Sequence, residues 1–261
     1  MSDVLDVPLS QWRQDEEIKI FNEAVSQFFE KELKPHVEDW REAGAVPRDV
    51  WYKAAEQGLL LVSAPEEYGG AGGDFRHDAV IIEQLELQGI AGFGIGLHNA
   101  IVAPYIIHYG SEEQKQRLLP KLASGELVCA IAMTEPGTGS DLQNIKTTAK
   151  KDGNGYVING SKTFISYGQT ANLILVCAKT DPSKGAKGIS IMLVETDEVE
   201  GFERGRNLKK IGQPAADTSE LFFNDVKVPA SALLGPEEGQ GFIQLMQQIT
   251  KERHIIGIQG F

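Results

Sequence analysis

Apolar residues recur at helical spacing over residues 1–125 of this 261-residue chain, which predicts a helical N-terminal region. Phe21, Ala24 and Phe28 fall on one face of the first helix. We expect Pro35 to end that helix, because proline cannot continue the hydrogen-bond ladder. Further helices are expected over residues 47–58, 74–88, 90–109 and 111–122, the last with a capping box at Ser111 and Gln114.

From residue 127 the pattern changes to short apolar runs separated by turn residues. The expected strands cover residues 128–134, 145–150, 156–159, 173–179, 189–194 and 219–228. Asp152–Gly155 is typical of a hairpin turn, and Gly160–Lys162 is expected to be another turn. The charged run 195–203 and Asp225 are expected to be solvated loops. Short strands at this spacing favour a small barrel or sandwich over a parallel Rossmann sheet.

Helical spacing returns in the last part of the chain. Four apolar residues share one predicted face there: Phe242, Leu245, Met246 and Ile249. The predicted fold class is therefore α+β, with an N-terminal α-helical domain (1–125), a β-barrel or sandwich domain (126–236) and the start of a C-terminal helical domain (237–261). Apolar residues continue up to Phe261, so we expect a fragment of a longer protein or a helix that packs on another subunit, and we favour the fragment.

Charge and hydropathy exclude several classes of function. The chain has 25 Lys and Arg residues against 37 Asp and Glu residues, a net charge of −12. Nucleic-acid binding needs a basic surface, so we expect no nucleic-acid partner. No apolar run approaches the ~20 residues of a membrane span, and residues 1–13 lack the pattern of a signal peptide, so we expect a cytoplasmic protein.

Other candidate residues favour structural roles. Cys129 and Cys177 lie in apolar runs and are expected to be core residues. Gly92, Gly94 and Gly96 resemble a dinucleotide-binding loop, but no strand precedes them, so we expect them to allow close packing of helices. The five histidines lack the spacing of metal ligands, and we expect no metal site: His36, His77, His98, His108 and His254.

The loop Met133–Asp141 is the first candidate for chemistry. It follows a predicted strand and combines Pro136 with Gly137 and Gly139, residues that suit a stiff loop with strained backbone angles. Outward-facing N–H groups and hydroxyls would suit a phosphate-bearing or heteroaromatic ligand. A tight turn between strands explains the same residues equally well.

A second candidate is the polar and aromatic cluster Thr163–Gly168. If this segment is a strand, Phe164 and Ser166 share one face, so a ring and a hydroxyl would lie side by side. Taken alone, an ordinary half-buried strand explains the cluster better.

Considered together, an ordered set of segments resembles the acyl-CoA dehydrogenase family of flavoproteins over nearly the whole chain. The segments are Pro65–Gly70, Gly110–Lys115, Met133–Asp141, Asn159–Lys162, Phe164–Ser166 and Val228–Gly235. Within the family, Lys251-Glu252-Arg253 is most similar to the long-chain members. Family members continue beyond this point with a helical bundle that supplies part of the cofactor pocket.

The resemblance implies FAD and assigns residues to it. Ile131, Ala132, Met133 and Thr134 match positions that line the flavin, and Gly139 and Ser140 match positions at the pyrophosphate. Phe164, Ile165 and Ser166 match the segment beside the flavin ring, with Phe164 stacked on it and Ser166 near N5. The implied substrate-binding residues are Ser140, Ala186, Lys187 and Arg253.

The implied reaction oxidises a long-chain acyl-CoA to the trans-2-enoyl-CoA. A base removes the α proton and the flavin takes the β hydride at N5. Glu252 matches one of the two positions at which the family carries its base. Without the resemblance, a surface glutamate pairing along its helix would be the better account of this residue.

The resemblance also implies electron-transfer flavoprotein as the electron acceptor and a homo-oligomer, a dimer or tetramer. The implied location is the cytoplasm in a bacterium or the mitochondrial matrix in a eukaryote. Two alternatives stay open. One is an acyl-CoA oxidase or other flavoenzyme on the same scaffold, and the other is a non-catalytic fragment.

Overall fold

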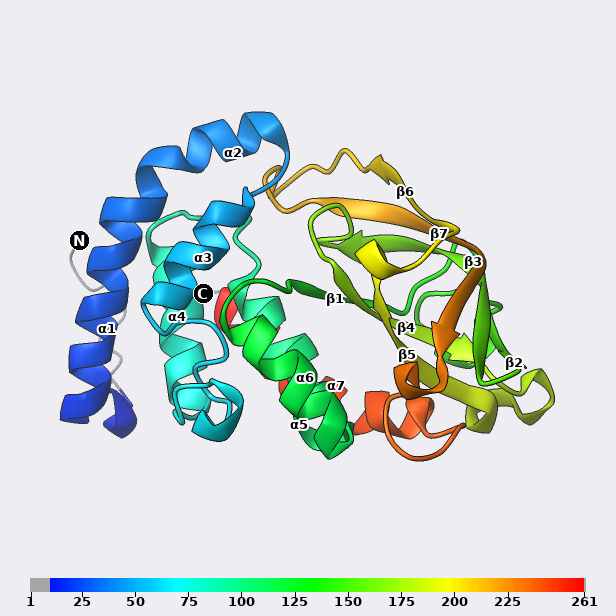
Figure 1. The fold of residues 1–261 in the computed structure, drawn as a ribbon. Helices are drawn as coiled ribbons and strands as arrows, with labels where there is room; N and C mark the ends of the chain where they lie inside the picture. Colours follow the sequence, from blue (N-terminus) through cyan, green and yellow to red (C-terminus); the bar gives the residue numbers. More distant parts are fainter. Residues whose placement is uncertain (1–9, 261) are drawn as a thin grey trace.

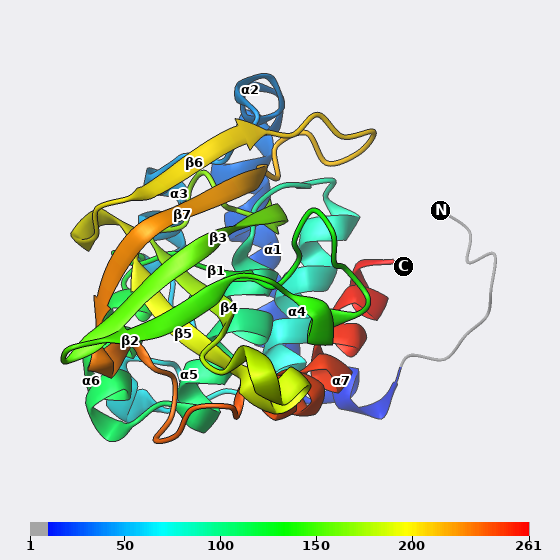
Figure 2. The same ribbon diagram turned by 90° about the vertical axis from the view of Figure 1, so that its right-hand side faces the viewer.

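The computed structural model describes residues 10–260, so residues 1–9 and Phe261, at the ends of the predicted terminal domains, lie outside the described residues. Figures 1 and 2 show the N-terminal helices on one side and a sheet on the other, with α5, α6 and α7 between them. The helices are α1 (Glu16–Phe28), α2 (Val37–Ala43), α3 (Arg48–Glu56), α4 (Phe75–Leu87), α5 (Ala103–Tyr109), α6 (Glu112–Ala123) and α7 (Gly241–Gln259).

Local capping signals were reliable guides to helix ends. Asp74 caps α4 by accepting a hydrogen bond from the Arg76 backbone N–H at 2.9 Å. Ser111 and Gln114 form both hydrogen bonds of the predicted capping box at the start of α6. Each of these signals acts within one helical turn, so the sequence alone is enough to locate it.

The expectation that Pro35 ends the first helix is wrong. The chain continues from α1 through a π-helical turn (Phe29–Leu33) and a 3₁₀ turn (Lys34–His36) into α2. Pro35 lies in the first turn of the 3₁₀ segment, where its missing N–H would have had no helical partner. The proline therefore marks a change of helix type.

The expected helix over 90–109 is also shorter than predicted. Helical geometry begins only just before a π-helical turn (Leu97–Val102) that leads into α5. Gly92 has a φ of +115°, and a Cβ on it would lie 2.5 Å from the Cβ of Ala215. This segment is a loop pressed against another part of the chain, and its glycines permit that contact.

The described residues contain a seven-stranded mixed sheet with the order β1-β4-β2-β3-β7-β6, and β5 also pairs with β4. Its strands are β1 (Cys129–Ala132), β2 (Thr148–Asp152), β3 (Gly155–Ser166), β4 (Leu173–Lys179), β5 (Ile189–Glu195), β6 (Phe202–Asn207) and β7 (Thr218–Pro229). Most neighbours are antiparallel, whereas β1 pairs with β4 in parallel. The α+β class is confirmed, and the β part is a half-barrel sheet (Figure 2).

Three segments predicted as turns or loops belong wholly or partly to strands. Gly160–Lys162 lies within β3, where the register against β7 shifts after Ile158. A Cβ on Gly160 would lie 2.4 Å from the Thr147 hydroxyl oxygen. Glycine is therefore needed here because β3 passes close to Thr147, and it does not form a turn. The end of the charged run 195–203 lies in β6, and Asp225 lies in β7. β6 carries no alternating apolar pattern, because it is an exposed edge strand.

Helix α7 packs on α4, α5 and β5. Leu245 and Ile255 are buried, but Met246 is 39% exposed, so it does not share the buried face predicted for it. Polar residues complete that face, since Gln244 and Gln248 are buried as well. Within residues 10–260, no helix is long and apolar enough to cross a membrane.

Candidate functional site

A cavity of about 410 Å³ lies between the loop before α5, the end of β3 and the end of α7. Phe164 and Ser166 of β3 line it together, as their predicted shared face requires. Leu97 and Ile101 come from the π-helical turn, and Ile256 comes from α7. We call this cavity the groove.

The groove presents an exposed aromatic ring because β3 is irregular at its end. The register between β3 and β7 shifts between Lys162 and Ile165. Phe164, inside the shift, has a φ of +57° and a side chain that is 66% exposed, whereas Ile165 is 2% exposed in the core. A bulky residue at positive φ is strained, and such strain concentrates at functional sites.

The wall behind Phe164 is closely packed. Tyr167 also has a positive φ, and a Cβ on Gly94 would lie 2.4 Å from its ring. This contact joins the loop before α5 to the residue that follows β3. Gly92 and Gly94 thus permit close packing of a loop, and not the close packing of helices that was predicted. The two sides of the groove are thereby held together.

The loop Met133–Asp141 owes its shape to a buried carboxylate. Glu135 accepts hydrogen bonds from the backbone N–H groups of Lys146 (2.6 Å) and Thr147 (2.9 Å) and from Lys162 Nζ (2.9 Å). Lys162 Nζ also donates to the Met133 carbonyl oxygen at 3.0 Å. The loop is therefore stiff, as predicted, but through Glu135 and Lys162.

One detail of the predicted loop is wrong, and the role of Thr138 was not predicted. Gly137 and Gly139 do not adopt positive φ. Thr138 is buried and donates its hydroxyl hydrogen bond to the Asn144 carbonyl oxygen at 3.2 Å, whereas Ser140 is exposed. The order inside the loop comes from side-chain hydrogen bonds, which the composition of a Pro-Gly turn does not reveal.

Burial acts to raise the pKa of Glu135, but Lys162 and the hydrogen bonds from Thr147 and Lys146 outweigh it and hold that pKa below its usual value. A carboxylate in these surroundings stays ionised. Glu135 is therefore an anchor for the loop and is not suited to accept a proton.

Glu252 of α7 has different surroundings. Its Oε1 accepts a hydrogen bond of 2.6 Å from the hydroxyl of Tyr105 on α5. Burial raises the pKa of Glu252, while the Tyr105 hydrogen bond acts to lower it. Among residues 10–260 it forms no ion pair, so it is not the surface glutamate of a helical Lys-Glu-Arg pair.

A second hydrogen-bonded contact joins the same two helices. Tyr109 lies four residues after Tyr105, donates to Gln247 Oε1 at 2.8 Å and accepts from Gln248 Nε2 at 3.1 Å. Residues four apart share a helical face, so α5 and α7 are joined by two successive polar contacts. We call this contact line the α5–α7 seam.

The seam leads towards the groove. Ile101 precedes Tyr105 by four residues and Ile256 follows Glu252 by four residues, and both isoleucines line the groove. One helical turn spans about 5.4 Å, so the Glu252 carboxylate lies about one turn from the groove along the seam. The sequence did not single out Tyr105. Its only signal was a phenol within an otherwise apolar helix.

The other predicted site residues lie outside the groove, on β1, on turns of the β part and on α7. Four of them, at the end of β1 and just after it, do not line the groove: Ile131, Ala132, Met133 and Thr134. The 3₁₀ turn that follows Ser140 contacts the turn Pro182–Gly188, which holds Ala186 and the exposed Lys187. Arg253 is exposed.

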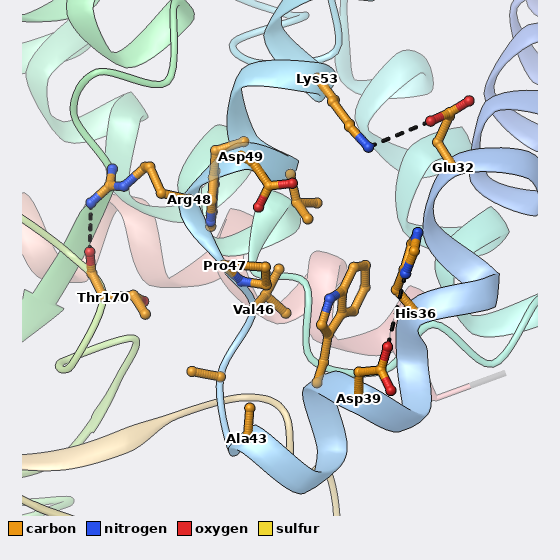
Figure 3. Close-up of a pocket in the computed structure, with 14 residues that line it drawn as sticks. Glu32, His36, Asp39, Ala43, Val46, Pro47, Arg48, Asp49, Lys53 and Thr170 are labelled. Carbon is orange, nitrogen blue, oxygen red and sulfur yellow. Dashed lines mark hydrogen bonds and ion pairs between the residues drawn. The ribbon is translucent and has the colours of Figure 1, made fainter.

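A larger cavity, of about 750 Å³, lies elsewhere (Figure 3). It lies beside α2 and α3 and contains none of the predicted site residues. Two of its charged side chains already have partners, since Lys53 lies 3.5 Å from Glu32 and Arg48 donates to the Thr170 carbonyl oxygen at 2.8 Å. Size alone therefore does not identify the site, and the chemistry points to the groove and the seam.

Comparisons with known proteins agree with this organisation. The family description "Acyl-CoA dehydrogenase, N-terminal domain" matches residues 15–126, and "Acyl-CoA dehydrogenase, middle domain" matches residues 130–226. The mitochondrial long-chain specific acyl-CoA dehydrogenase of Sus scrofa is 48% identical over 91% of this chain and 55% of its own length. The chain thus spans about half the length of that relative.

Solved structures show the same likeness in three dimensions. An acyl-CoA dehydrogenase from Geobacillus kaustophilus has a TM-score of 0.91 at 53% identity, covering 94% of this chain and 64% of that one. A glutaryl-CoA dehydrogenase from Mycobacterium smegmatis, solved in complex with FADH2, has a TM-score of 0.83 at 30% identity, covering 94% and 61%. With two matching domains and relatives of this identity, the chain belongs to the acyl-CoA dehydrogenase family.

Proposed function

We propose that the protein is an FAD-dependent acyl-CoA dehydrogenase that converts long-chain acyl-CoA to the trans-2-enoyl-CoA, with Glu252 as its base. The observation that carries the proposal is the Glu252 carboxylate, partly buried in the α5–α7 seam about one helical turn from the groove. The long-chain preference rests on the resemblance and on the 48% identity to the long-chain relative.

The residues present fit a flavin. Phe164 offers an exposed ring to a planar partner, and Ser166 lies with it in the groove. Among the described residues, no atom lies within 4 Å of the position that a Cβ on Gly137 or Gly139 would take, so the backbone there is open to a phosphate group. Phe164 and Ser166 would hold the FAD ring in the groove. The resemblance also assigns Ile165 and residues 131–134 to the ring and Gly139 and Ser140 to the pyrophosphate, although Ile165 is buried and 131–134 do not line the groove.

In the reaction, the substrate loses an α proton and a β hydride and gains a carbon–carbon double bond. FAD, when bound, supplies the acceptor for the hydride. Glu252 takes the proton, and burial suits it to this task because a raised pKa makes a carboxylate a better base. Ser140, Ala186, Lys187 and Arg253 hold the CoA thioester, with the Lys187 ammonium suited to a CoA phosphate.

The remaining parts of the proposal concern the whole protein. Electron-transfer flavoprotein is the proposed acceptor, and a homo-oligomer is the proposed assembly. The proposed location is the cytoplasm of a bacterium or the matrix of a mitochondrion, as in the mitochondrial relative.

The test begins with flavin binding. Purified chain is mixed with FAD, freed of excess cofactor and treated with palmitoyl-CoA without oxygen, and the flavin absorbance is followed. We expect bleaching in the wild type and a loss of rate of about 10²–10⁴-fold in Glu252→Gln, the usual contribution of a general base. Glu237→Gln, an exposed glutamate just before α7, is the matched control and should bleach at the wild-type rate.

Failure to bind FAD would contradict the proposal for these 261 residues. Normal bleaching in Glu252→Gln would show that another residue is the base. Oxygen consumption with acyl-CoA and no other acceptor would indicate an oxidase. Acyl-CoA binding without bleaching would indicate a non-catalytic protein. A series of acyl chain lengths tests the long-chain preference.

A further inference from the structure

Tyr105 places a single polar atom in apolar surroundings. Its side chain is fully buried in the cluster that also contains Ile106, Leu175 and Ile255. A buried hydroxyl without a partner is costly, and the Tyr105 hydroxyl meets this requirement by donating to Glu252 Oε1 at 2.6 Å. Each of the two groups thus fixes the position of the other.

The contact is held by the framework on both sides. The Tyr109 contact with Gln247 and Gln248 fixes the alignment of α5 and α7 one turn away. The ring of Tyr105 lies 6.3 Å from that of Tyr109, and buried apolar side chains pack around it and restrict its movement. The phenol is therefore a rigid donor, whereas a glutamate side chain alone has several rotamers.

We propose that Tyr105 is the positioning residue for Glu252, holding its carboxylate ionised and fixed in the α5–α7 seam, ready to accept a proton. The inference rests on the proposed function in one respect, namely that Glu252 is the base. Tyr105 itself is assigned no contact with substrate or cofactor.

The direction of the effect follows from the hydrogen bond. A neutral donor stabilises the charged carboxylate and opposes the upward effect of burial on the Glu252 pKa. Phenylalanine keeps the ring and removes only the donor. The carboxylate would then be both less ionised near neutral pH and free to change rotamer.

The first measurement needs neither cofactor nor substrate. The chain is labelled with ¹³C at the glutamate carboxyl groups, the Glu252 signal is assigned by its loss in Glu252→Gln, and its titration is followed by NMR. We expect Tyr105→Phe to raise the titration midpoint by about 1–2 pH units, the effect of removing one hydrogen bond to a charged group. Tyr109→Phe removes the neighbouring contact of the same seam and should leave that midpoint in place.

An unchanged midpoint in Tyr105→Phe, or equal shifts in both variants, would overturn the inference, because packing alone would then explain Tyr105. The melting temperature of each variant shows whether it folds. If Tyr105→Phe does not fold, incorporation of 3-fluorotyrosine in place of tyrosine keeps the ring and makes the Tyr105 hydroxyl a stronger donor. The Glu252 midpoint should then fall, and an unchanged or higher midpoint would count against the inference.

The second measurement separates this inference from the proposed function. The pH profile of flavin bleaching should shift upward in Tyr105→Phe by the amount seen in the titration, with the rate largely recovered at high pH. If Glu252→Gln bleaches normally, the proposed base is wrong, whatever Tyr105 does to the titration. If Glu252→Gln is inactive but the pH profile of bleaching in Tyr105→Phe is unshifted, Glu252 is still supported as the base. In that case the positioning role of Tyr105 is contradicted.

Discussion

Two glutamates in this chain, Glu135 buried and Glu252 partly buried, have opposite surroundings. Beneath the Met133 loop, Glu135 is matched by the ammonium of Lys162 and by two backbone N–H groups, and its pKa lies below the usual value. In the α5–α7 seam, Glu252 has the neutral Tyr105 hydroxyl, and its pKa lies above the usual value. The same side chain serves as an anchor in one place and is suited to proton transfer in the other, because their partners differ.

The largest expected effect concerns the anchor. Lys162→Met leaves Glu135 as a buried charge without its cation, and we expect the free energy of unfolding to fall by about 3–5 kcal/mol. Lys151→Met is the matched control, since Lys151 is exposed, pairs with Glu238 at the surface and should cost about 1 kcal/mol or less. Urea unfolding measures both, and equal losses would remove the distinction between a buried anchor and a surface pair.

The contribution of the Glu135 anchor to the free energy of unfolding also depends on pH. The folded-state pKa of Glu135 lies below its unfolded value, so its stabilisation is present above the usual glutamate pKa and is lost as the pH falls through the lowered one. The wild type should therefore lose stability over that range, and Lys162→Met should lose less of it. A parallel loss in the two proteins would contradict this assignment.

A third carboxylate extends the comparison, with a somewhat smaller expected effect. Asp78 of α4 is 1% exposed, and neither of its oxygens has a hydrogen-bond partner within the described part of the chain. Burial raises its pKa to about 6 from an ordinary 3.8, with Ser63 and Lys251 opposing the rise. Asp78 therefore destabilises the folded chain progressively as the pH rises from about 4 to above 6.

We expect Asp78→Asn to stabilise the chain by about 2–3 kcal/mol at pH 8, which corresponds to a pKa shift of about 2 units. The gain should vanish below about pH 4, where both side chains are neutral. Denaturant unfolding at the two pH values measures it. A gain that does not depend on pH would mean that ionisation of Asp78 is not its cause.

The smallest expected effect concerns the groove. Phe164→Gly relieves the positive φ and removes a mostly exposed ring, so the chain should gain about 0.5–1 kcal/mol of stability. Phe164→Ala removes the same ring but keeps a Cβ at that φ, so it should lack the gain. Both should weaken FAD binding in a fluorescence titration, and unchanged affinity would remove Phe164 from the proposed flavin site.

Local signals in the sequence predicted much of the fold. The cap at Ser111 and the hairpin at Asp152–Gly155 act over a few residues, and each was placed correctly. The failures needed information from elsewhere in the chain. Pro35 is tolerated because helix type changes there, and the edge strand β6 is recognised only by its pairing with β7.

In the candidate site, too, the predictions from neighbouring residues were right, and the contacts between distant residues were missed. Phe164 and Ser166 are close in sequence, and they do line one groove. Glu252 and Tyr105 are 147 residues apart, so no sequence motif could predict the hydrogen bond between them. The proton-binding character of Glu252 follows from burial in the seam, which only the packing of α7 on α5 creates.

The contact between Gly94 and Tyr167 has a consequence for how this chain tolerates mutation. The requirement at Gly94 is one of volume, because its φ is not positive and the three atoms nearest to a Cβ there all belong to the Tyr167 ring. A saturation library selected for folded protein should therefore retain glycine alone at 94 while Tyr167 is present, but admit alanine or serine once a smaller residue replaces that tyrosine. Gly137, with open space around it, should accept many residues in the same library. Gly94 and Gly137 look alike in the sequence, but they would differ in the substitutions they accept, because the space around them differs.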